Sequence, residues 1–272
     1  MPEAGTEAAG RSAGALDRLS PATLFSLKGK VALVTGAAGG IAMGITQALA
    51  AAGARLALTD RSNEVADRAA ELDRNGVDAA SFVLDITDPA AIATAFAQVI
   101  KRFGRIDILV NNAGVIVRKP FLDVTLDDWR RVIDTDLTAC FVVGQHAARI
   151  MVSQRSGRII NIGSIMAHVS RPDLVPYVSA KGAISAFTRA LAADLAGTGV
   201  TVNALAPGYI ATSFGMASNK PFHDFVSDWT PARRWGRPED LSGPVLLLAS
   251  EAGGYINGQT LYVDGGFLAV TK

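Results

Sequence analysis

The sequence predicts an α/β fold: a doubly wound, seven-stranded parallel sheet with helices on both faces. Short apolar runs alternate with helix-length segments from about residue 27 onward. Most of the runs are nearly continuous in aliphatic residues, as in strands that are buried on both faces. The length of 272 residues and the hydrophobic share of 49% suit one large domain.

Each apolar run is interpreted as one strand, and the strands are joined by right-handed crossovers. The predicted strands are 31–34, 56–58, 82–84, 106–110, 158–162, 200–205 and 259–263. Segments long enough for helices lie at 40–52, 89–103, 126–151 and 176–196.

Two segments stand apart from this alternation. Residues 1–26 are rich in Ala, Gly, Glu and Ser, so we expect a flexible N-terminal extension before a single domain over 27–272. The segment 210–230 follows the end of a strand, where ligands bind in such sheets. Its length and irregularity favour a lid over a ligand rather than an ordinary surface excursion.

Composition argues against several classes of function. The net charge of +1, without a basic run, gives no field for nucleic acid. We find no apolar stretch that could span a bilayer and no secretory signal, so no membrane association is expected. The single cysteine, Cys140, indicates a reducing, cytoplasmic compartment and is expected in the core. No histidine pair has metal-ligand spacing, so no metal site is expected.

A glycine-rich turn, Gly36 to Ile41, joins the first strand to the following helix. Its glycines allow the backbone to approach a pyrophosphate, and the helix offers free N–H groups and a positive dipole end. Asp60 ends the second strand and can accept hydrogen bonds from ribose hydroxyls, while it would repel a 2′-phosphate. NAD is therefore favoured over NADP, although the positive charge of the neighbouring Arg61 weakens this preference. Asp60 could instead be a solvated loop carboxylate.

Two further strand ends contribute candidate cofactor contacts. Asp85 could meet the adenine amine or cap the helix that begins near residue 89. Asn112, Ala113 and Gly114 let a cofactor pass close to the backbone, although a simple turn would have the same composition.

A catalytic group is suggested by Tyr177 and Lys181, which share one face of a helix that Pro176 would begin, although this spacing alone would also fit an ordinary helix surface. The lysine charge favours the phenolate form of the tyrosine, which could then exchange a proton with an alcohol or a carbonyl. Ser164, beyond the fifth strand, could hold the substrate oxygen against Tyr177, or it could be a capping serine.

Taken together, TGAAGGIA, NNAG, Ser164, YVSAK and the later Pro207-Gly208 resemble the short-chain dehydrogenase/reductase family over about residues 27–266. The resemblance implies a Rossmann-like fold and an oxidoreductase whose catalytic residues are Ser164, Tyr177, Lys181 and Asp136. It also implies a set of cofactor contacts: Gly36, Gly39, Gly40, Ile41, Asp60, Arg61, Asp85, Ile86, Asn112, Ala113, Gly114, Tyr177, Lys181, Pro207, Gly208, Ile210 and Thr212.

The chain departs from the family pattern at two positions. Ala42 replaces the third glycine of the turn, where a methyl group should be tolerated because that position serves helix–strand packing. Asp136 stands where the family has an asparagine that helps to hold a water mainly through its backbone carbonyl. We therefore expect the proton relay to persist, with the carboxylate hydrogen-bonded locally.

The substrate prediction begins at Arg118, which follows NNAG and could bind a carboxylate bidentately or simply be a solvated rim cation. The stretches 25–30, 115–120, 231–244 and 257–268 are similar to gluconate 5-dehydrogenases and keto-deoxygluconate dehydrogenases. That similarity implies a small sugar acid as substrate, and Arg118 and Ser164 are expected as contacts. Tyr209, Arg171 and His168 could add polar contacts, although His168 could equally be a structural histidine.

Two other functions stay open at this point. A 3-oxoacyl thioester reductase of the same family would favour NADPH and a basic docking patch, which Asp60 and the net charge oppose. A non-catalytic NAD(H)-binding sensor would not need Ser164, Tyr177 and Lys181. The family resemblance also implies a homo-oligomer, usually a tetramer, built through the two longest helical segments and the C-terminal strand.

Overall fold

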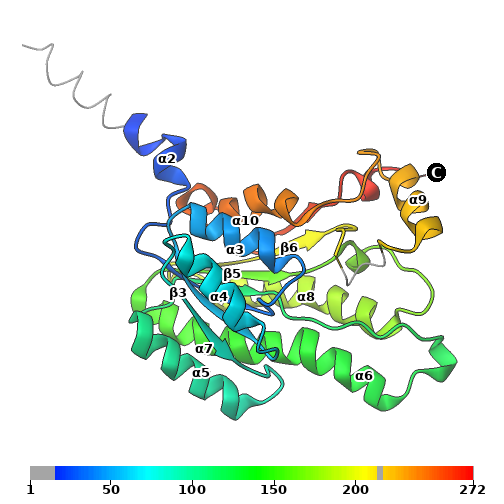
Figure 1. The fold of residues 1–272 in the computed structure, drawn as a ribbon, viewed down its shortest axis with the longest axis horizontal. Helices are drawn as coiled ribbons and strands as arrows, with labels where there is room; N and C mark the ends of the chain where they lie inside the picture. Colours follow the sequence, from blue (N-terminus) through cyan, green and yellow to red (C-terminus); the bar gives the residue numbers. More distant parts are fainter. Residues whose placement is uncertain (1–15, 213–216, 272) are drawn as a thin grey trace, which may run out of the picture.

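The computed structural model describes residues 16–212 and 217–271, and its centre is one seven-stranded parallel sheet (Figure 1). The strand order is β3-β2-β1-β4-β5-β6-β7, and every neighbouring pair is parallel. The strands are β1 (Val31–Thr35), β2 (Arg55–Asp60), β3 (Ala79–Val83), β4 (Ile108–Asn111), β5 (Gly157–Ile162), β6 (Val200–Pro207) and β7 (Thr260–Val263). The order changes direction between β1 and β4, so a crevice opens there at the carboxyl ends of the strands.

Helices cover both faces of the sheet (Figure 1). The helices are α2 (Pro21–Leu24), α3 (Ala42–Ala51), α4 (Val65–Arg74), α5 (Pro89–Phe103), α6 (Leu126–Ile133), α7 (Ala139–Gln154), α8 (Val175–Asp194), α9 (Lys220–Trp229) and α10 (Ser242–Ala249). The first apolar cluster joins the sheet to α3, α4 and α10, and the second joins it to α5, α7 and α8. No helix in the described part of the chain is both long and apolar enough to cross a bilayer.

The alternation of side chains along each strand explains why the central strands need to be apolar throughout. In β1, Ala32 and Val34 pack in the first cluster, whereas Val31 and Leu33 pack in the second. In β1, β2 and β4 the polar side chains lie at the strand ends, and the carboxyl ends are where the candidate site residues occur.

All seven predicted strands are present, so the predicted fold class is confirmed. The third strand begins earlier than expected, at Ala79, because small residues at a sheet edge give a weak apolar signal. The expected helix over 126–151 is divided by a π-helical turn, η2 (Asp134–Thr138), between α6 and α7. Helix α8 begins at Val175, two residues before Tyr177.

The two unusual segments are only partly described. Of the predicted extension, residues 1–15 lie outside the described residues, and α2 begins after a Ser20 cap whose hydroxyl accepts from the Thr23 N–H. Of the predicted lid, residues 213–216 lie outside them, and the remainder contains α9. A covering role for this segment stays a prediction.

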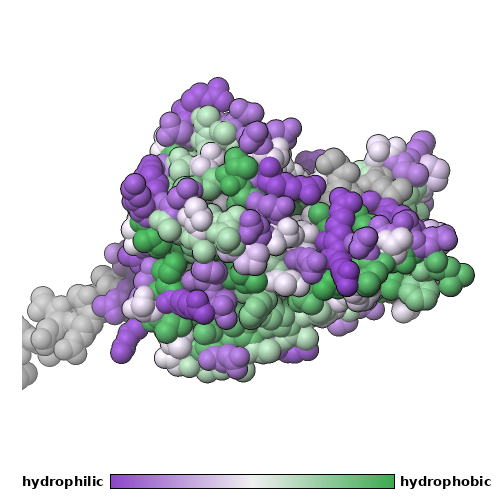
Figure 2. Space-filling model, turned by 90° about the horizontal axis from the view of Figure 1, so that it is seen from below, coloured by the Kyte–Doolittle hydropathy of each residue, from purple (hydrophilic) through white to green (hydrophobic). Residues whose placement is uncertain are grey.

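The surface of the molecule mixes charged and apolar side chains. In the view from below in Figure 2, hydrophobic residues gather in patches between hydrophilic ones. Exposed large apolar residues include Phe121, Leu122, Leu126, Trp129 and Phe141, which lie on or near α6 and α7.

Candidate active site

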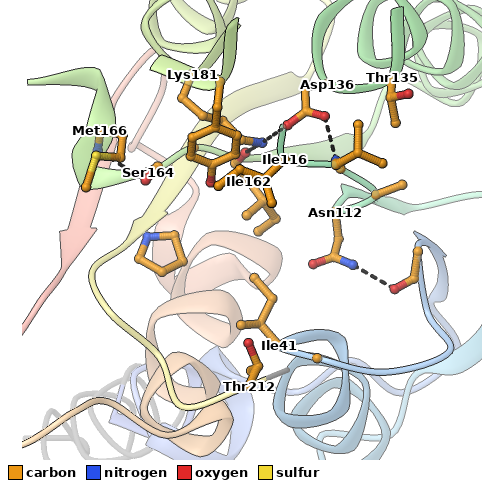
Figure 3. Close-up of a pocket in the computed structure, with 18 of the residues that line it drawn as sticks. Ile41, Asn112, Ile116, Thr135, Asp136, Ile162, Ser164, Met166, Lys181 and Thr212 are labelled. Carbon is orange, nitrogen blue, oxygen red and sulfur yellow. Dashed lines mark hydrogen bonds and ion pairs between the residues drawn. The ribbon is translucent and has the colours of Figure 1, made fainter. Parts of the chain in front are cut away.

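A cavity of about 630 Å³ opens at the carboxyl ends of the strands (Figure 3). All the candidate catalytic, cofactor and substrate residues predicted from the sequence, apart from His168, line it. The fold thus brings together side chains and backbone from the ends of β1, β2, β4, β5 and β6 and from helix α8.

The glycine turn after β1 lies against the end of β4. Gly36 has φ +64°, and a Cβ at this position would lie 2.7 Å from the Ala113 Cα. Gly39 has open space around it, and α3 begins without a side-chain cap. The N–H groups of the first turn of α3 are thus left for an external acceptor, as a bound phosphate would require.

Asp60 is tied to the backbone of this turn. Its Oδ2 accepts from the Ala38 N–H at 3.1 Å, and its Oδ1 accepts from the Ser62 N–H at 2.9 Å. The carboxylate is half-buried on the cavity wall, so it is not a freely solvated loop group. Arg61 also lines the cavity, but it is exposed.

Asn112 connects the ends of β1 and β4. Its Nδ2 donates to the carbonyls of Thr35 and Gly36, at 2.9 Å each. The Thr35 hydroxyl accepts from the N–H groups of Asn112 and Ala113 at 3.0 and 3.1 Å. Sequence reasoning missed Thr35, because nothing near it in the chain indicates this contact across two strands.

Asp85 does not cap the following helix, so that alternative is wrong. Its Oδ1 accepts from the N–H and the hydroxyl of Thr87, which lowers the pKa of Asp85. Asp88 caps α5 instead, accepting from Ala90 and Ala91. Asp85 lies on the cavity wall, with Ile86 beside it.

Ser164 and helix α8 bring three polar groups together. The Ser164 hydroxyl accepts from the Met166 N–H at 3.1 Å, and it also hydrogen-bonds to Tyr177. The serine is therefore both a cap of the short turn that follows β5 and a neighbour of the tyrosine. Lys181 lies one helical turn after Tyr177, with its Nζ 5.6 Å from the centre of the tyrosine ring.

Lys181 is almost completely buried and has two oxygen partners. Its Nζ donates to the Ile162 carbonyl at 3.1 Å and lies 3.2 Å from Asp136 Oδ2 (Figure 3). Burial alone would lower the pKa of Lys181, but the Asp136 carboxylate together with Tyr177 and Cys140 outweighs burial and keeps that pKa above its ordinary value. Burial raises the pKa of Tyr177, while the Lys181 charge opposes this shift.

Asp136 reaches Lys181 because it lies in the π-helical turn η2. Its Oδ1 accepts from the Val115 N–H at 2.7 Å, and its side chain is buried beside Gly114. Burial raises the pKa of Asp136, and the Lys181 charge opposes that shift. A π-helical turn inside a longer helix is often found at a functional site, and the sequence did not indicate the turn or the direct ion pair.

Two arginines also line the cavity. Arg118 follows β4, and Arg171 follows β5. Burial, and next the Arg171 charge, lower the pKa of Arg118. Lys119, in contrast, pairs with Asp128 at 2.5 Å and does not line the cavity.

These features define a dinucleotide-binding oxidoreductase with a proton-transfer group beside the cofactor cleft. A family model described as enoyl-(acyl carrier protein) reductase matches residues 36–268. The chain belongs to the short-chain dehydrogenase/reductase family, whose members use a nicotinamide cofactor.

Similarity to individual relatives covers nearly the whole chain. A 2-dehydro-3-deoxy-D-gluconate 5-dehydrogenase of Formosa agariphila is 37% identical, over 90% of this chain and 95% of the relative. A gluconate 5-dehydrogenase of Gluconobacter oxydans is 39% identical, over 91% and 98%. The structure of a gluconate 5-dehydrogenase from Burkholderia cenocepacia, in complex with NADP and tartrate, has a TM-score of 0.89 at 38% identity and covers 93% of this chain and all of that one.

Proposed function

We propose that this protein transfers a hydride between NAD(H) and a secondary alcohol or ketone of a sugar acid such as gluconate or 5-ketogluconate. The observation that carries this proposal is that Arg118 lines the same cavity as Ser164 and Tyr177. A guanidinium can bind a carboxylate bidentately while the serine and tyrosine hold a hydroxyl. The activities named for the relatives support the same substrate class.

The proposed roles follow from the positions of the side chains. Ser164 hydrogen-bonds the substrate oxygen, and Tyr177 accepts the hydroxyl proton during oxidation or returns it during reduction. Lys181 favours the phenolate electrostatically and binds the nicotinamide ribose, and Asp136 holds the lysine charge. When bound, the nicotinamide supplies the hydride acceptor or donor; the ketone forms as the C–H and O–H bonds of the alcohol break.

The residues of the turn fit a dinucleotide, with the pyrophosphate at the N-terminus of α3 and the adenosine ribose at Asp60. The remaining predicted contacts would hold the adenine side at Asp85 and Ile86 and the nicotinamide side at 207–212. Preference for NAD rests on the negative charge of Asp60. The relative with bound NADP makes this preference a point to test directly.

The alternative functions have different requirements. A 3-oxoacyl thioester reductase would prefer NADPH and an acidic carrier protein, whereas a sensor would bind NADH without turnover. We also propose a cytoplasmic homotetramer, because the only cysteine is a buried free thiol and apolar side chains remain exposed on or near α6 and α7.

The first experiment measures NAD⁺ and NADP⁺ reduction with sugar acids, neutral polyols and simple secondary alcohols. Turnover with gluconate or a related acid on NAD⁺ is the expected result. Activity on neutral alcohols alone would remove the sugar-acid proposal, and tight NADH binding without any turnover would favour the sensor.

Replacing Asp60 tests the cofactor proposal. In Asp60→Asn the charge is lost, so the ratio of kcat/KM for NAD⁺ to that for NADP⁺ should fall by at least about tenfold, equivalent to about 1.4 kcal/mol. The Ser62 contact can survive through the amide oxygen, while the Ala38 contact weakens. Equal losses with both cofactors would instead show that Asp60 only shapes the turn.

A further inference from the structure

Arg171, which lines the cavity, packs against an aromatic cluster. Its guanidinium carbon lies 4.1 Å from the centre of the Phe222 ring, which belongs to helix α9. The guanidinium also donates to the Tyr209 hydroxyl. Tyr209 in turn packs against Phe222 and Trp235, with ring centres 5.4 and 5.5 Å apart.

Arg171 lines the cavity, and among the residues that the structure describes no carboxylate forms an ion pair with it. Arg171 is close enough to Arg118 for its charge to lower the pKa of Arg118. Two neighbouring guanidiniums repel each other, and an anion bound between them would relieve that repulsion.

We propose that Arg171 is a specificity-determining residue that binds the substrate carboxylate together with Arg118, and that Tyr209 and Phe222 position it. This inference rests on the proposed sugar-acid function and deepens it. Arg171 has five N–H donors, so donors remain for a carboxylate after one is given to Tyr209. The rings of Phe222 and Tyr209 restrict a long side chain before substrate arrives, which reduces the entropic cost of binding.

The proposal also gives Tyr209 a different role from the one expected from sequence. Its hydroxyl accepts from Arg171, so Tyr209 acts on the substrate through the arginine. The carboxylate then lies at the two arginines, and the reacting hydroxyl lies at Ser164 and Tyr177. A hydroxy acid has both groups, whereas a neutral polyol can use only the second site.

The test compares gluconate with the corresponding neutral hexitol in Arg171→Ala and Arg171→Lys. In Arg171→Ala, KM for gluconate should rise at least about tenfold while kcat changes much less, and KM for the hexitol should stay within about twofold. Arg171→Lys should be intermediate, because an ammonium keeps the charge but loses the planar fork. Phe222→Leu should shift KM in the same direction by a smaller factor, again only for the acid.

Arg74→Ala is the matched control, because Arg74 is an exposed arginine at the end of α4 that does not line the cavity. It should change neither KM. An equal loss of both substrates in Arg171→Ala, or an unchanged KM for gluconate, would overturn the assignment of Arg171.

Binding separates this inference from the proposed function. Calorimetry with gluconate and the NADH-saturated enzyme measures affinity where no hydride can be accepted. If the wild type binds gluconate without oxidising it with NAD⁺, and Arg171→Ala weakens that binding, the arginine assignment stands while the proposed function fails. If the wild type oxidises gluconate but Arg171→Ala binds it equally well, the proposed function stands and the Arg171 assignment fails. If the wild type does not bind gluconate, both the function and the assignment are overturned.

Discussion

At the scale of single residues, the ion pair of Lys181 and Asp136 sets the charge beside Tyr177. Both partners are buried, at 5% and 2% exposure, so each charge depends on the other. Removing one partner of such a pair usually costs more than the pair contributes, because the remaining charge stays in a poorly solvated place. An asparagine would keep the shape of Asp136 and remove only its charge.

Asp136→Asn should therefore move the acidic limb of the pH profile for alcohol oxidation to lower pH. The Asp136 charge raises the pKa of Tyr177. Removing that charge lowers the pKa of Tyr177, so the phenolate forms at lower pH. Lys181 loses the carboxylate that raises its own pKa, and the predicted direction requires Lys181 to stay protonated, because its charge lowers the pKa of Tyr177. We expect a shift below one pH unit and a change in turnover below about tenfold.

The measurement is kcat against pH with a saturating substrate, and exposed Asp127 on α6 offers a control as Asp127→Asn. An acidic limb that moves upward, or a gain in turnover above tenfold, would contradict the proposed role of Asp136.

Which residues sequence reasoning located depended on whether their partners lie nearby in the chain. Tyr177 and Lys181 are one helical turn apart, and Ser164 lies at a strand end, so their spacing together with the family motifs indicated them. Thr35 contacts residues 77 and 78 positions away, and Phe222 on Arg171 depends on how α9 packs. Contacts of this kind are fixed by tertiary packing, which a pattern in one sequence does not encode.

At the scale of elements, the turn between β1 and α3 and the π-helical turn η2 position the two halves of the site. The turn brings Gly36 against Ala113, and η2 carries Asp136 to Lys181. The glycine turn was predictable because glycines are required where backbones meet. The π-helical turn was not, because the apolar pattern of 126–151 is compatible with one continuous helix.

Gly36→Ala and Gly39→Ala should separate stability from cofactor binding. Alanine at position 36 would need a positive φ and would place its Cβ 2.7 Å from the Ala113 Cα. The free energy of unfolding should therefore fall by roughly 1–3 kcal/mol. Gly39 has negative or extended φ and open space, so alanine there should leave stability nearly unchanged and weaken only dinucleotide binding.

Thermal unfolding and NADH titration of the two variants give the comparison. A Gly36→Ala protein as stable as the wild type would show that the turn and the end of β4 move apart easily, contrary to their packing in this structure.

At the scale of the whole molecule, the sheet divides the interior into two apolar clusters, and the polar groups of the candidate site lie at the carboxyl ends of the strands. That division follows from near-continuous apolar strands, which is why the fold class could be predicted from the sequence. Association between copies could not be predicted in the same way, because it depends on which apolar side chains the helices leave uncovered. Phe141 on α7 is 49% exposed and meets Phe187 of α8 edge-on at 6.5 Å, so these helices share an uncovered apolar face.

Phe141→Glu should therefore dissociate the proposed tetramer into smaller species. A carboxylate placed in an apolar interface loses its hydration without gaining a partner, and two copies would meet across a symmetric contact. Sedimentation velocity over a range of protein concentrations measures the change, with Leu16→Glu as the control because Leu16 is 71% exposed and lies before α2. The control should keep the size of the wild type. A monomeric wild type would contradict the proposed tetramer. A Phe141→Glu protein of unchanged size would place the contact between copies elsewhere, because an interface at α7 would not tolerate a buried, unpaired charge.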